Sequence, residues 1–249
     1  SRIDKAAAKN KAHIVTIEIG GTVGEYQNIL FLEAVRMLKL KKLNDVLLIL
    51  VSYLPIQSKD SELKTKPTQY AVRTLNSAGL QPDIIIARAI LPLDKKRKEK
   101  LAFNCNMSEN DIISAPDVES IYEVPVNFEK DGMSDVILGK LKLKPAGRDF
   151  SRWRRLAGSI SRAKKPVKIG IVGKYFSTGN FVLSDAYISV IEAVKHAAYF
   201  FNRKPVIEWL NAESFEKNPS LLKQLSEYDG IIVPGGFGDR GVEGKISAI

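Results

Sequence analysis

Short apolar runs alternate along the chain with longer segments in which apolar residues recur at helical spacing. The strand-like runs lie at residues 13–19, 46–52 and 84–89, and the helix-like segments lie at residues 28–41, 67–77 and 95–103. Because the runs are rich in β-branched residues and lack polar alternation, they predict a parallel sheet covered by helices on both faces. The expected fold class is therefore α/β.

The pattern changes in a basic stretch at residues 140–166, where glycine and proline interrupt the periodicity. Beyond it, strands are predicted at residues 168–172, 205–210 and 231–233, and helices at 184–201 and 219–228, the first capped by Ser184. We therefore expect two domains, at residues 1–145 and 167–249, joined by a linker at 146–166. A sheet that stopped at Ile249 would leave an unpaired edge strand, which predicts that the chain is a piece of a longer protein.

The composition is that of an ordinary soluble protein, with 45% apolar and 27% charged residues. No apolar run is long enough to span a membrane, and the start of the chain lacks the apolar stretch of a signal peptide. A single cysteine excludes an internal disulfide framework, so a reducing cytoplasm is the expected compartment.

The formal net charge is +10, and basic residues gather at 94–100 and 148–168. A basic balance can indicate a nucleic-acid partner, but no interleaved aromatic residues or zinc-type spacing accompany these clusters. We expect solvated surface and an attraction for anionic nucleotides, and no nucleic-acid partner.

Two cations, two hydroxyls, an amide and a proline fall within six residues, Lys64-Thr65-Lys66-Pro67-Thr68-Gln69, just before a helix-like segment. Pro67 suits a first helical turn, where its missing N–H is not needed. The free N–H groups and the dipole of that helix end attract anions, and Lys64 and Lys66 reinforce the attraction. The segment predicts either a polyphosphate site or a solvated basic loop that caps an ordinary helix.

An acidic residue, Glu18, interrupts the first apolar run, which leads into Gly20-Gly21-Thr22-Val23-Gly24. In a buried strand an unpaired carboxylate is costly. Either a Mg²⁺ ion or a salt bridge to lysine or arginine would compensate its charge, and the strand alone does not choose between them.

Seven motifs follow one another along the chain. They are Glu18-Ile19-Gly20-Gly21-Thr22-Val23-Gly24, residues 64–69, Gln81-Pro82-Asp83-Ile84-Ile85-Ile86-Ala87-Arg88, Asp117-Val118-Glu119-Ser120-Ile121-Tyr122, Gly173-Lys174-Tyr175, Ser184-Asp185-Ala186-Tyr187 and Pro234-Gly235-Gly236-Phe237-Gly238. In their order and spacing they resemble the CTP synthase family. No single motif decides the resemblance, which rests on the ordered set.

The resemblance implies a chain that is an internal fragment. Members of the family carry a phosphate loop before the point that matches Ser1, and a glutaminase Cys, His and Glu beyond the point that matches Ile249. Cys105 lies in Asn104-Cys105-Asn106 and matches no nucleophile. We therefore expect the C-terminal part of a P-loop-type synthetase domain, followed by the N-terminal part of a flavodoxin-like class I glutamine amidotransferase domain.

The family's reaction implies the ligands. CTP synthases use ATP and Mg²⁺ to phosphorylate the uracil 4-oxygen of UTP, and ammonia released from glutamine then displaces the phosphate to give CTP. GTP activates the enzyme, and the family forms homotetramers. Because the fragment lacks the phosphate loop and the nucleophile, we expect it to make no CTP alone from glutamine or ammonia.

Family positions carry over to particular residues of the first domain. By resemblance Glu18 binds Mg²⁺. Lys64, Thr65, Lys66, Pro67, Thr68 and Gln69 bind the UTP or CTP triphosphate across a subunit boundary, together with Lys100, for which a solvated surface role is the alternative. Pro116, Asp117 and Val118 match the adenine-binding segment, although the family commonly has lysine where Pro116 stands.

A stretch that contributes to CTP recognition in the family is Glu25-Tyr26-Gln27, and it departs from the usual acidic, apolar, acidic pattern. Glu25 keeps the charge, but Gln27 replaces a carboxylate. Because a ribose hydroxyl donates less strongly to a neutral amide than to a carboxylate, we expect altered CTP feedback.

In the second domain, the resemblance makes Gly235 and Gly236 the oxyanion loop that contacts glutamine and Phe237 a contact of the GTP activator. A simple strand-end glycine turn is the alternative. His13 and His196 match no catalytic histidine. Two rival functions remain, another ATP-dependent amidotransferase of the same plan, such as the cobyric acid synthase type, and a non-catalytic regulatory or assembly relative.

Overall fold

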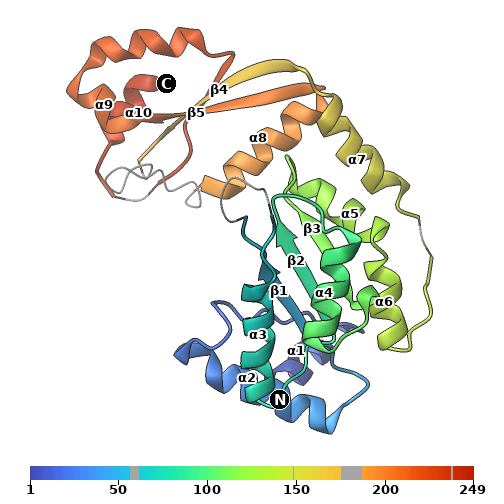
Figure 1. Ribbon diagram of the computed structural model, residues 1–249. Coiled ribbons are helices and arrows are strands. Elements are labelled where there is room, and N and C mark those ends of the chain that lie inside the picture. The colour runs from blue at the N-terminus through green and yellow to red at the C-terminus, as the bar shows by residue number, and fades with distance from the viewer. Residues whose placement is uncertain (57–61, 148, 175–186, 237) are drawn as a thin grey trace. The chain divides into compact units, whose positions relative to one another are not determined.

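The computed structural model describes residues 1–56, 62–147, 149–174, 187–236 and 238–249. The chain forms two compact units, Ser1–Asp149 and Phe150–Ile249, drawn from blue to red in Figure 1. Each unit contains its own parallel sheet and its own apolar core. The α/β class expected from the sequence is confirmed.

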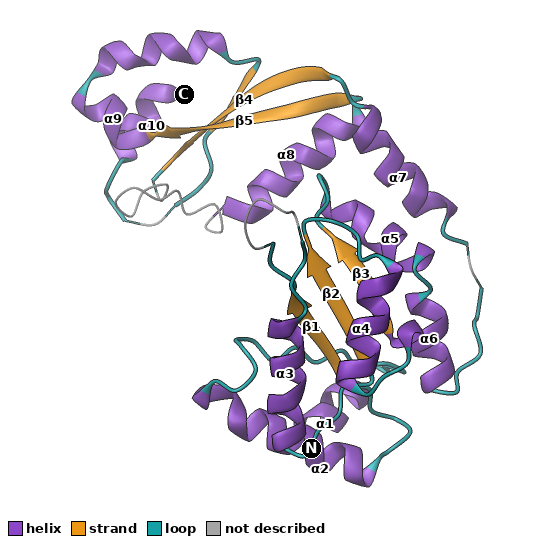
Figure 2. Cartoon of the chain, in the orientation of Figure 1, coloured by secondary structure: helices purple, strands orange, loops and turns teal. Residues whose placement is uncertain are grey.

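The first unit is built on three parallel strands in the order β1-β2-β3 (Figure 2). These strands are β1 (Ile49–Tyr53), β2 (Ile84–Ala89) and β3 (Ile112–Pro116). Successive side chains of a strand point to opposite faces, and β2 divides its apolar residues accordingly. Ile85 and Ala87 belong to a core with Leu50, whereas Ile84 and Ile86 belong to a second core with Ile113. The sheet is therefore buried on both faces, as its unbroken apolar strands predicted.

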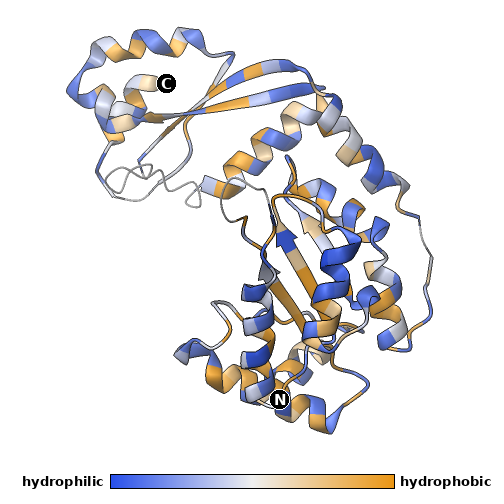
Figure 3. Cartoon of the chain, in the orientation of Figure 1, coloured by the Kyte–Doolittle hydropathy of each residue, from blue (hydrophilic) through white to orange (hydrophobic). Residues whose placement is uncertain are grey.

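Two helices supply the core on the Ile85 face, α3 (Lys66–Ser77) and α4 (Lys95–Cys105), through buried residues such as Val72 and Leu101. On the other face, side chains of α5 (Val124–Lys130) and α6 (Met133–Lys140) pack against Ile113. Figure 3 shows α4 as largely hydrophilic at its basic first turns. The remaining helices of this unit are α1 (Arg2–Lys9), η1 (Tyr26–Asn28), α2 (Ile29–Lys41), η2 (Glu109–Asp111) and η3 (Ile121–Glu123).

The ends of α3 and α4 have local causes. Helix α3 begins after Thr65 with Pro67 in its first turn, and the chain leaves it through Gly79 at φ +73°, a conformation that glycine adopts without strain. Helix α4 begins after Asp94, whose carboxylate accepts a hydrogen bond from the backbone N–H of Arg97. These starts lie within one residue of the predicted ones.

The buried strand expected at residues 13–19 was wrong. This segment forms no strand, and Ile14 and Ile17 are 63% and 53% exposed. A β-branched run becomes a strand only when a neighbouring strand completes its hydrogen bonds, and no neighbour pairs with this one in the described part of the chain. Glu18 is consequently exposed, and the buried carboxylate expected from the sequence does not occur.

The second unit has three parallel strands in the order β5-β4-β6: β4 (Lys165–Gly173), β5 (Arg203–Asn211) and β6 (Gly230–Ile232). Helix α7 (Ser151–Arg162) precedes β4, and α8 (Ile188–Phe200) connects β4 with β5. The chain then passes through α9 (Ala212–Lys217) and η5 (Pro219–Glu227) to β6, and ends in α10 (Val242–Ala248). Val172 and Phe215 lie in one core of this unit, and Ile171 and Tyr187 lie in another.

Several details differ from the expectations for this unit. The helix expected at 219–228 is a 3-10 helix, and the stretch expected as a linker contains the 12-residue helix α7. Ser184, the expected cap, lies outside the described residues, and α8 begins at Ile188. In the described residues, no helix is both long and apolar enough to cross a membrane.

Candidate functional site

In the first unit, two predicted nucleotide-binding segments lie beyond parallel strands: residues 64–69 follow β1, and residues 116–118 lie at the end of β3. Parallel strands bring their carboxyl ends to one edge of a sheet, where open α/β folds commonly bind ligands. The backbone ties the edge together, because Leu54 N–H donates to Arg88 O at 2.7 Å and Asp117 N–H donates to Ala89 O at 2.8 Å. The edge therefore brings together the segments after β1, β2 and β3.

Within residues 64–69, three side chains face inward. The hydroxyl of Thr68 is 2.9 Å from that of Ser52 on β1, and Thr68 is fully buried. The amide of Gln69 donates to the hydroxyl of Thr65 at 3.1 Å, and both residues are buried. The hydroxyl of Thr65 does not cap the helix. Thr68 therefore anchors the start of α3 to the sheet, whereas Thr65 and Gln69 are bonded to each other within the segment.

The two lysines of this loop are less buried than these side chains. Lys66 and Pro67 are exposed at the start of α3, while Lys64 is half-buried and donates to Glu62 at 2.6 Å. The hydrogen bond from Lys64 holds the pKa of the Glu62 carboxyl below its usual range, with smaller effects from the charges of Arg97 and Lys100. Lys64 and Lys100 thus belong to one positively charged surface, and both of their charges act on the Glu62 carboxylate.

The segment after β3 presents one charged group. Pro116 is half-buried and pairs with Ala89, whereas Asp117 is exposed, and its carboxylate lies 3.5 Å from the guanidinium of Arg88. Val118 is half-buried. These positions leave backbone atoms and the Arg88–Asp117 pair available at the edge.

The glycine turn before Glu25-Tyr26-Gln27 lies elsewhere. Gly24 has φ +95°, and a Cβ on it would be 3.0 Å from Cγ2 of Thr74 in α3. Thr74 is eight residues after Lys66, or about 12 Å along the helix axis. The structure therefore places this turn beside the far half of α3, while Glu25, Tyr26 and Gln27 themselves are exposed.

Glu18, the predicted Mg²⁺ ligand, is a single exposed carboxylate. No group of three or more potential ligands occurs among the described residues. Mg²⁺ at nucleotide sites is commonly bound by one or two carboxylates together with phosphates and water. An exposed single carboxylate fits that mode of binding, and it does not form a metal site made by protein alone.

In the second unit, residues 234–236 and Gly238 follow β6 and lie against two buried lysines. Lys174, at the end of β4, donates from Nζ to Gly238 O, and Lys245, on α10, donates to Pro234 O at 2.5 Å. Lys174 and Lys245 are 7% and 8% exposed. Burial lowers the pKa of the Lys245 ammonium, and the neighbouring charge of Lys174 lowers it further.

Gly235 and Gly236 are exposed on this loop, whereas Phe237 lies outside the described residues. The two lysines were missed as functional candidates. Lys174 belongs to a motif that carried the family resemblance, and only Gly244 next to Lys245 hints at close packing in the sequence.

Helix α10 is held tightly against α9. A Cβ on Gly244 would lie 1.8 Å from Ala212 O, and the Gly244 N–H donates to the carboxylate of Glu216 at 3.2 Å. Glycine at this position therefore allows the close approach of α10, which carries Lys245, to α9.

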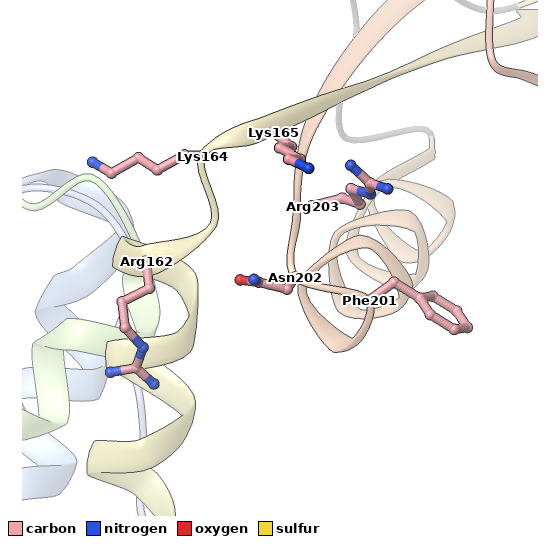
Figure 4. A pocket seen from close by; sticks show the side chains of 6 residues that line it. All are labelled: Arg162, Lys164, Lys165, Phe201, Asn202 and Arg203. Carbon is pink, nitrogen blue, oxygen red and sulfur yellow. The ribbon is translucent and has the colours of Figure 1, made fainter.

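A basic cavity of about 370 Å³ lies at the opposite, amino-terminal end of β4 and β5, as Figure 4 shows. It is lined by Arg162, Lys164, Lys165, Phe201, Asn202 and Arg203. In Figure 4 Lys165 and Arg203 point toward each other, but Arg162, Lys164 and Phe201 point away from them. The side chains do not converge on one ligand position.

Comparison with known proteins identifies the family. A family model described as "CTP synthase N-terminus" matches residues 1–143, and one described as "Glutamine amidotransferase class-I" matches residues 182–249. The chain belongs to the CTP synthase family. The resemblance inferred from the motifs is confirmed, including the amidotransferase part.

Curated CTP synthases align along essentially the whole chain. The enzyme of Carboxydothermus hydrogenoformans is 46% identical over 249 residues, and those of Listeria monocytogenes serotype 4b and Bacillus subtilis are each 39% identical, over 249 and 248 residues. The alignments cover 99–100% of this chain but only 45–46% of those three proteins. The chain thus spans less than half the length of these CTP synthases.

Proposed function

We propose that the protein to which this chain belongs makes CTP from UTP by ATP-dependent amination, with ammonia taken from glutamine. The observation that carries the proposal is the segment at residues 64–69. In a member of the CTP synthase family, it places two lysines and the N-terminus of α3 next to the carboxyl edge of a parallel sheet. Such an edge suits a polyphosphate because N–H groups, helix dipole and cations act on the same anion.

The roles follow from burial. Lys66 and the free N–H groups of the first turn of α3 would contact the triphosphate of UTP or CTP, and Lys64 and Lys100 would add positive charge. Thr65, Thr68 and Gln69 would act indirectly, by holding the loop to β1 and α3, because their side chains are buried and bonded within the protein. ATP would lie near Pro116, Asp117 and Val118.

Charge neutralisation and positioning supply most of the catalysis in phosphoryl transfer. Mg²⁺, held mainly by phosphates with Glu18 as one ligand, would provide part of that neutralisation. In the second unit, Gly235 and Gly236 would receive the developing oxyanion of glutamine, with GTP binding near Phe237.

We assign the Glu25–Gln27 segment to a nucleotide site that two copies of the chain share. It follows a turn beside Thr74, about 12 Å along the helix axis from Lys66, so the two segments are not adjacent within one copy. This separation supports a site shared between protomers of a homotetramer. We place this enzyme in the cytoplasm. Its domains would divide at residues 1–145 and 167–249, the first with a P-loop-type fold and the second with a flavodoxin-like fold.

The nucleotide site is tested by titrating UTP and Mg²⁺ into the chain by calorimetry, with Lys66→Ala as the variant and Lys95→Ala as its matched control. Each lysine is the first residue of a helix and is exposed. Loss of a charge-assisted contact to phosphate predicts an affinity reduced about tenfold or more for Lys66→Ala and by less than about twofold for Lys95→Ala. Equal losses would show unspecific charge attraction.

The reaction is tested by CTP formation in the complete reading frame. Glutamine and ammonia should each support CTP formation when ATP and UTP are present. Absence of CTP with both nitrogen donors would refute the proposed reaction, and would favour the regulatory or assembly role as the alternative.

A further inference from the structure

The glycine loop of the second unit is packed on one side by two buried ammonium groups. A Cβ on Gly236 would lie 3.4 Å from Nζ of Lys245 and 3.5 Å from both Cδ and Cε of Lys174. Both lysines therefore lie on the same side of Gly236, the ammonium group of Lys245 and the aliphatic part of Lys174.

The hydrogen bonds of these lysines determine how the loop peptides face. Nζ of Lys245 donates to Pro234 O at 2.5 Å and to Gly235 O at 3.5 Å, and no cis peptide occurs in the described chain. In a trans peptide the C=O and the following N–H point in opposite directions. The N–H groups of Gly235 and Gly236 must therefore point away from Lys245.

Both N–H groups are available for a ligand. Gly235 and Gly236 are exposed, and neither N–H donates a hydrogen bond to any residue that the structure describes. Two adjacent N–H groups that face one way form a donor pair for an oxygen atom that carries or develops negative charge.

We propose that Lys245, assisted by Lys174, is a positioning residue that holds the N–H groups of Gly235 and Gly236 outward as this donor pair. The inference rests on the proposed glutaminase role of the loop for its use in the reaction, although the geometry itself does not. Lys245 never touches the substrate; it orients the peptides, and its positive charge adds favourable potential at the oxygen.

The physical cost of the arrangement supports a role for the charge. Burying an ammonium group is unfavourable unless hydrogen bonds replace its water, and here three carbonyl oxygens do so for two lysines. A methionine of similar length would fill the same space without this cost. The charge contributes what methionine lacks, which is a directional bond to the peptide oxygens.

The first experiment measures ¹H–¹⁵N heteronuclear NOE values in the chain itself, for the wild type, Lys245→Met and the control Lys217→Met on the exposed side of α9. In Lys245→Met, the NOE of Gly235 and Gly236 should fall because their peptides are no longer held. The NOE of Gly170 and Gly230 in the sheet should stay unchanged, as should all four in the control.

The second experiment measures kinetics in the complete enzyme. Because misoriented donors weaken transition-state binding, Lys245→Met should lower kcat with glutamine about 10- to 100-fold and change KM by less than about threefold. CTP formation from added ammonia should stay within about twofold of the wild type, because ammonia bypasses the glutaminase site.

The outcomes separate the two proposals. Unchanged NOE values for Gly235 and Gly236 would overturn the positioning role whatever the activity does. A loosened loop with equal losses for glutamine and ammonia would show a merely structural lysine and overturn the role in the reaction. A loosened loop in a wild-type enzyme that never uses glutamine would leave the positioning intact and refute the proposed function of the loop.

Discussion

The two candidate loops use lysine in opposite ways. In the loop before α3, Lys66 is exposed, and the anchors are the buried side chains of Thr65, Thr68 and Gln69. In the loop after β6, the lysines are buried and bind carbonyl oxygens, while the backbone of Gly235 and Gly236 is exposed. A site for a polyanion can present charge directly, whereas a site for a single developing oxyanion can present backbone N–H groups supported from behind.

In both loops burial, more than residue type, decides what a lysine does. An exposed ammonium attracts an anion through water and is screened by salt. A buried ammonium must be bonded inside the protein, so it becomes a fixed structural donor. Removing the support of each loop should therefore affect the two loops in different ways.

The largest effect is expected for Gly244→Ala, which disturbs the packing of α10, the helix that carries Lys245. The added Cβ would meet Ala212 O at 1.8 Å, so α10 must move away from α9. We expect the free energy of unfolding of this unit to fall by about 3 kcal/mol. Thermal or urea unfolding followed by circular dichroism measures it.

Gly139→Ala on α6 is the matched control for a glycine within a helix, because nothing lies within 4 Å of its added Cβ. It should stabilise the first unit by about 0.5–1 kcal/mol. A Gly244→Ala variant as stable as the wild type would contradict the close packing of α10.

A smaller effect is expected for Thr68→Val, which removes the anchor of the loop before α3. The buried hydroxyl that pairs with Ser52 is lost, and the Ser52 hydroxyl loses its partner, so the free energy of unfolding should fall by about 1–2 kcal/mol. Thr74→Val is the control in the same helix; it loses only a hydroxyl bonded to Tyr70 O and should change stability by less than about 0.5 kcal/mol.

A double-mutant cycle with Ser52→Ala sharpens this test. If the two hydroxyls support each other, the combined loss should be smaller than the sum of the single losses. Strict additivity would show that the pair is not coupled and that Thr68 anchors the loop in some other way.

An acid-dependent effect is expected in the second unit for Glu208→Gln. The hydrogen bond from Tyr228, 2.7 Å long, chiefly lowers the pKa of Glu208, and Lys168 lowers it further. A carboxyl whose pKa is lowered in the folded state stabilises the protein above its ordinary pKa near 4.5 and loses this contribution as the pH falls through the folded value.

The stability difference between wild type and Glu208→Gln should therefore be present at pH 7 and should shrink below about pH 4.5. Urea denaturation across the acid range measures it, and Glu227→Gln, at a more exposed carboxylate, is the control. A stability difference that grows toward low pH would show that the folded state does not favour the ionised form of Glu208.

The smallest effect is expected at Cys105. Burial raises the pKa of its thiol to about 11, and the residue is 2% exposed, so at pH 8 it should react with an aromatic disulfide reagent only when the chain unfolds. Release of the coloured thiolate with and without urea measures this. Rapid reaction in the native protein would contradict the burial of α4 against the first core.

Prediction from sequence worked best where local pattern and final burial agree. Helices α3 and α4 and strand β2 lie where the apolar periodicity predicted them, because apolar residues of each one become buried in the core. Strand β3 was missed because only Ile112 and Ile113 form its apolar run before Ser114, Ala115 and Pro116. The strand wrongly expected at 13–19 has a suitable sequence, but it has no pairing partner among the residues that the structure describes, and no local sequence signal indicates this.

For the site, the sequence located the loop before α3 and the loop after β6, because lysine, proline and glycine mark helix starts and turns. The nucleotide role of the first loop and the oxyanion role of the second, which the family resemblance implies, stay predictions. The sequence did not indicate that Thr68 and Gln69 face inward, or that Lys174 and Lys245, 71 positions apart, converge on one loop.

Apolar periodicity and the ordered motifs were enough to assign the chain to the α/β class and to the CTP synthase family, and to locate the loops in which charge and glycine accumulate. Which lysines are exposed and which are buried behind the backbone became visible only in the folded structure. The reason is physical: composition and periodicity act over a few residues, whereas burial and hydrogen-bond partners are set when distant elements such as β4 and α10 pack together.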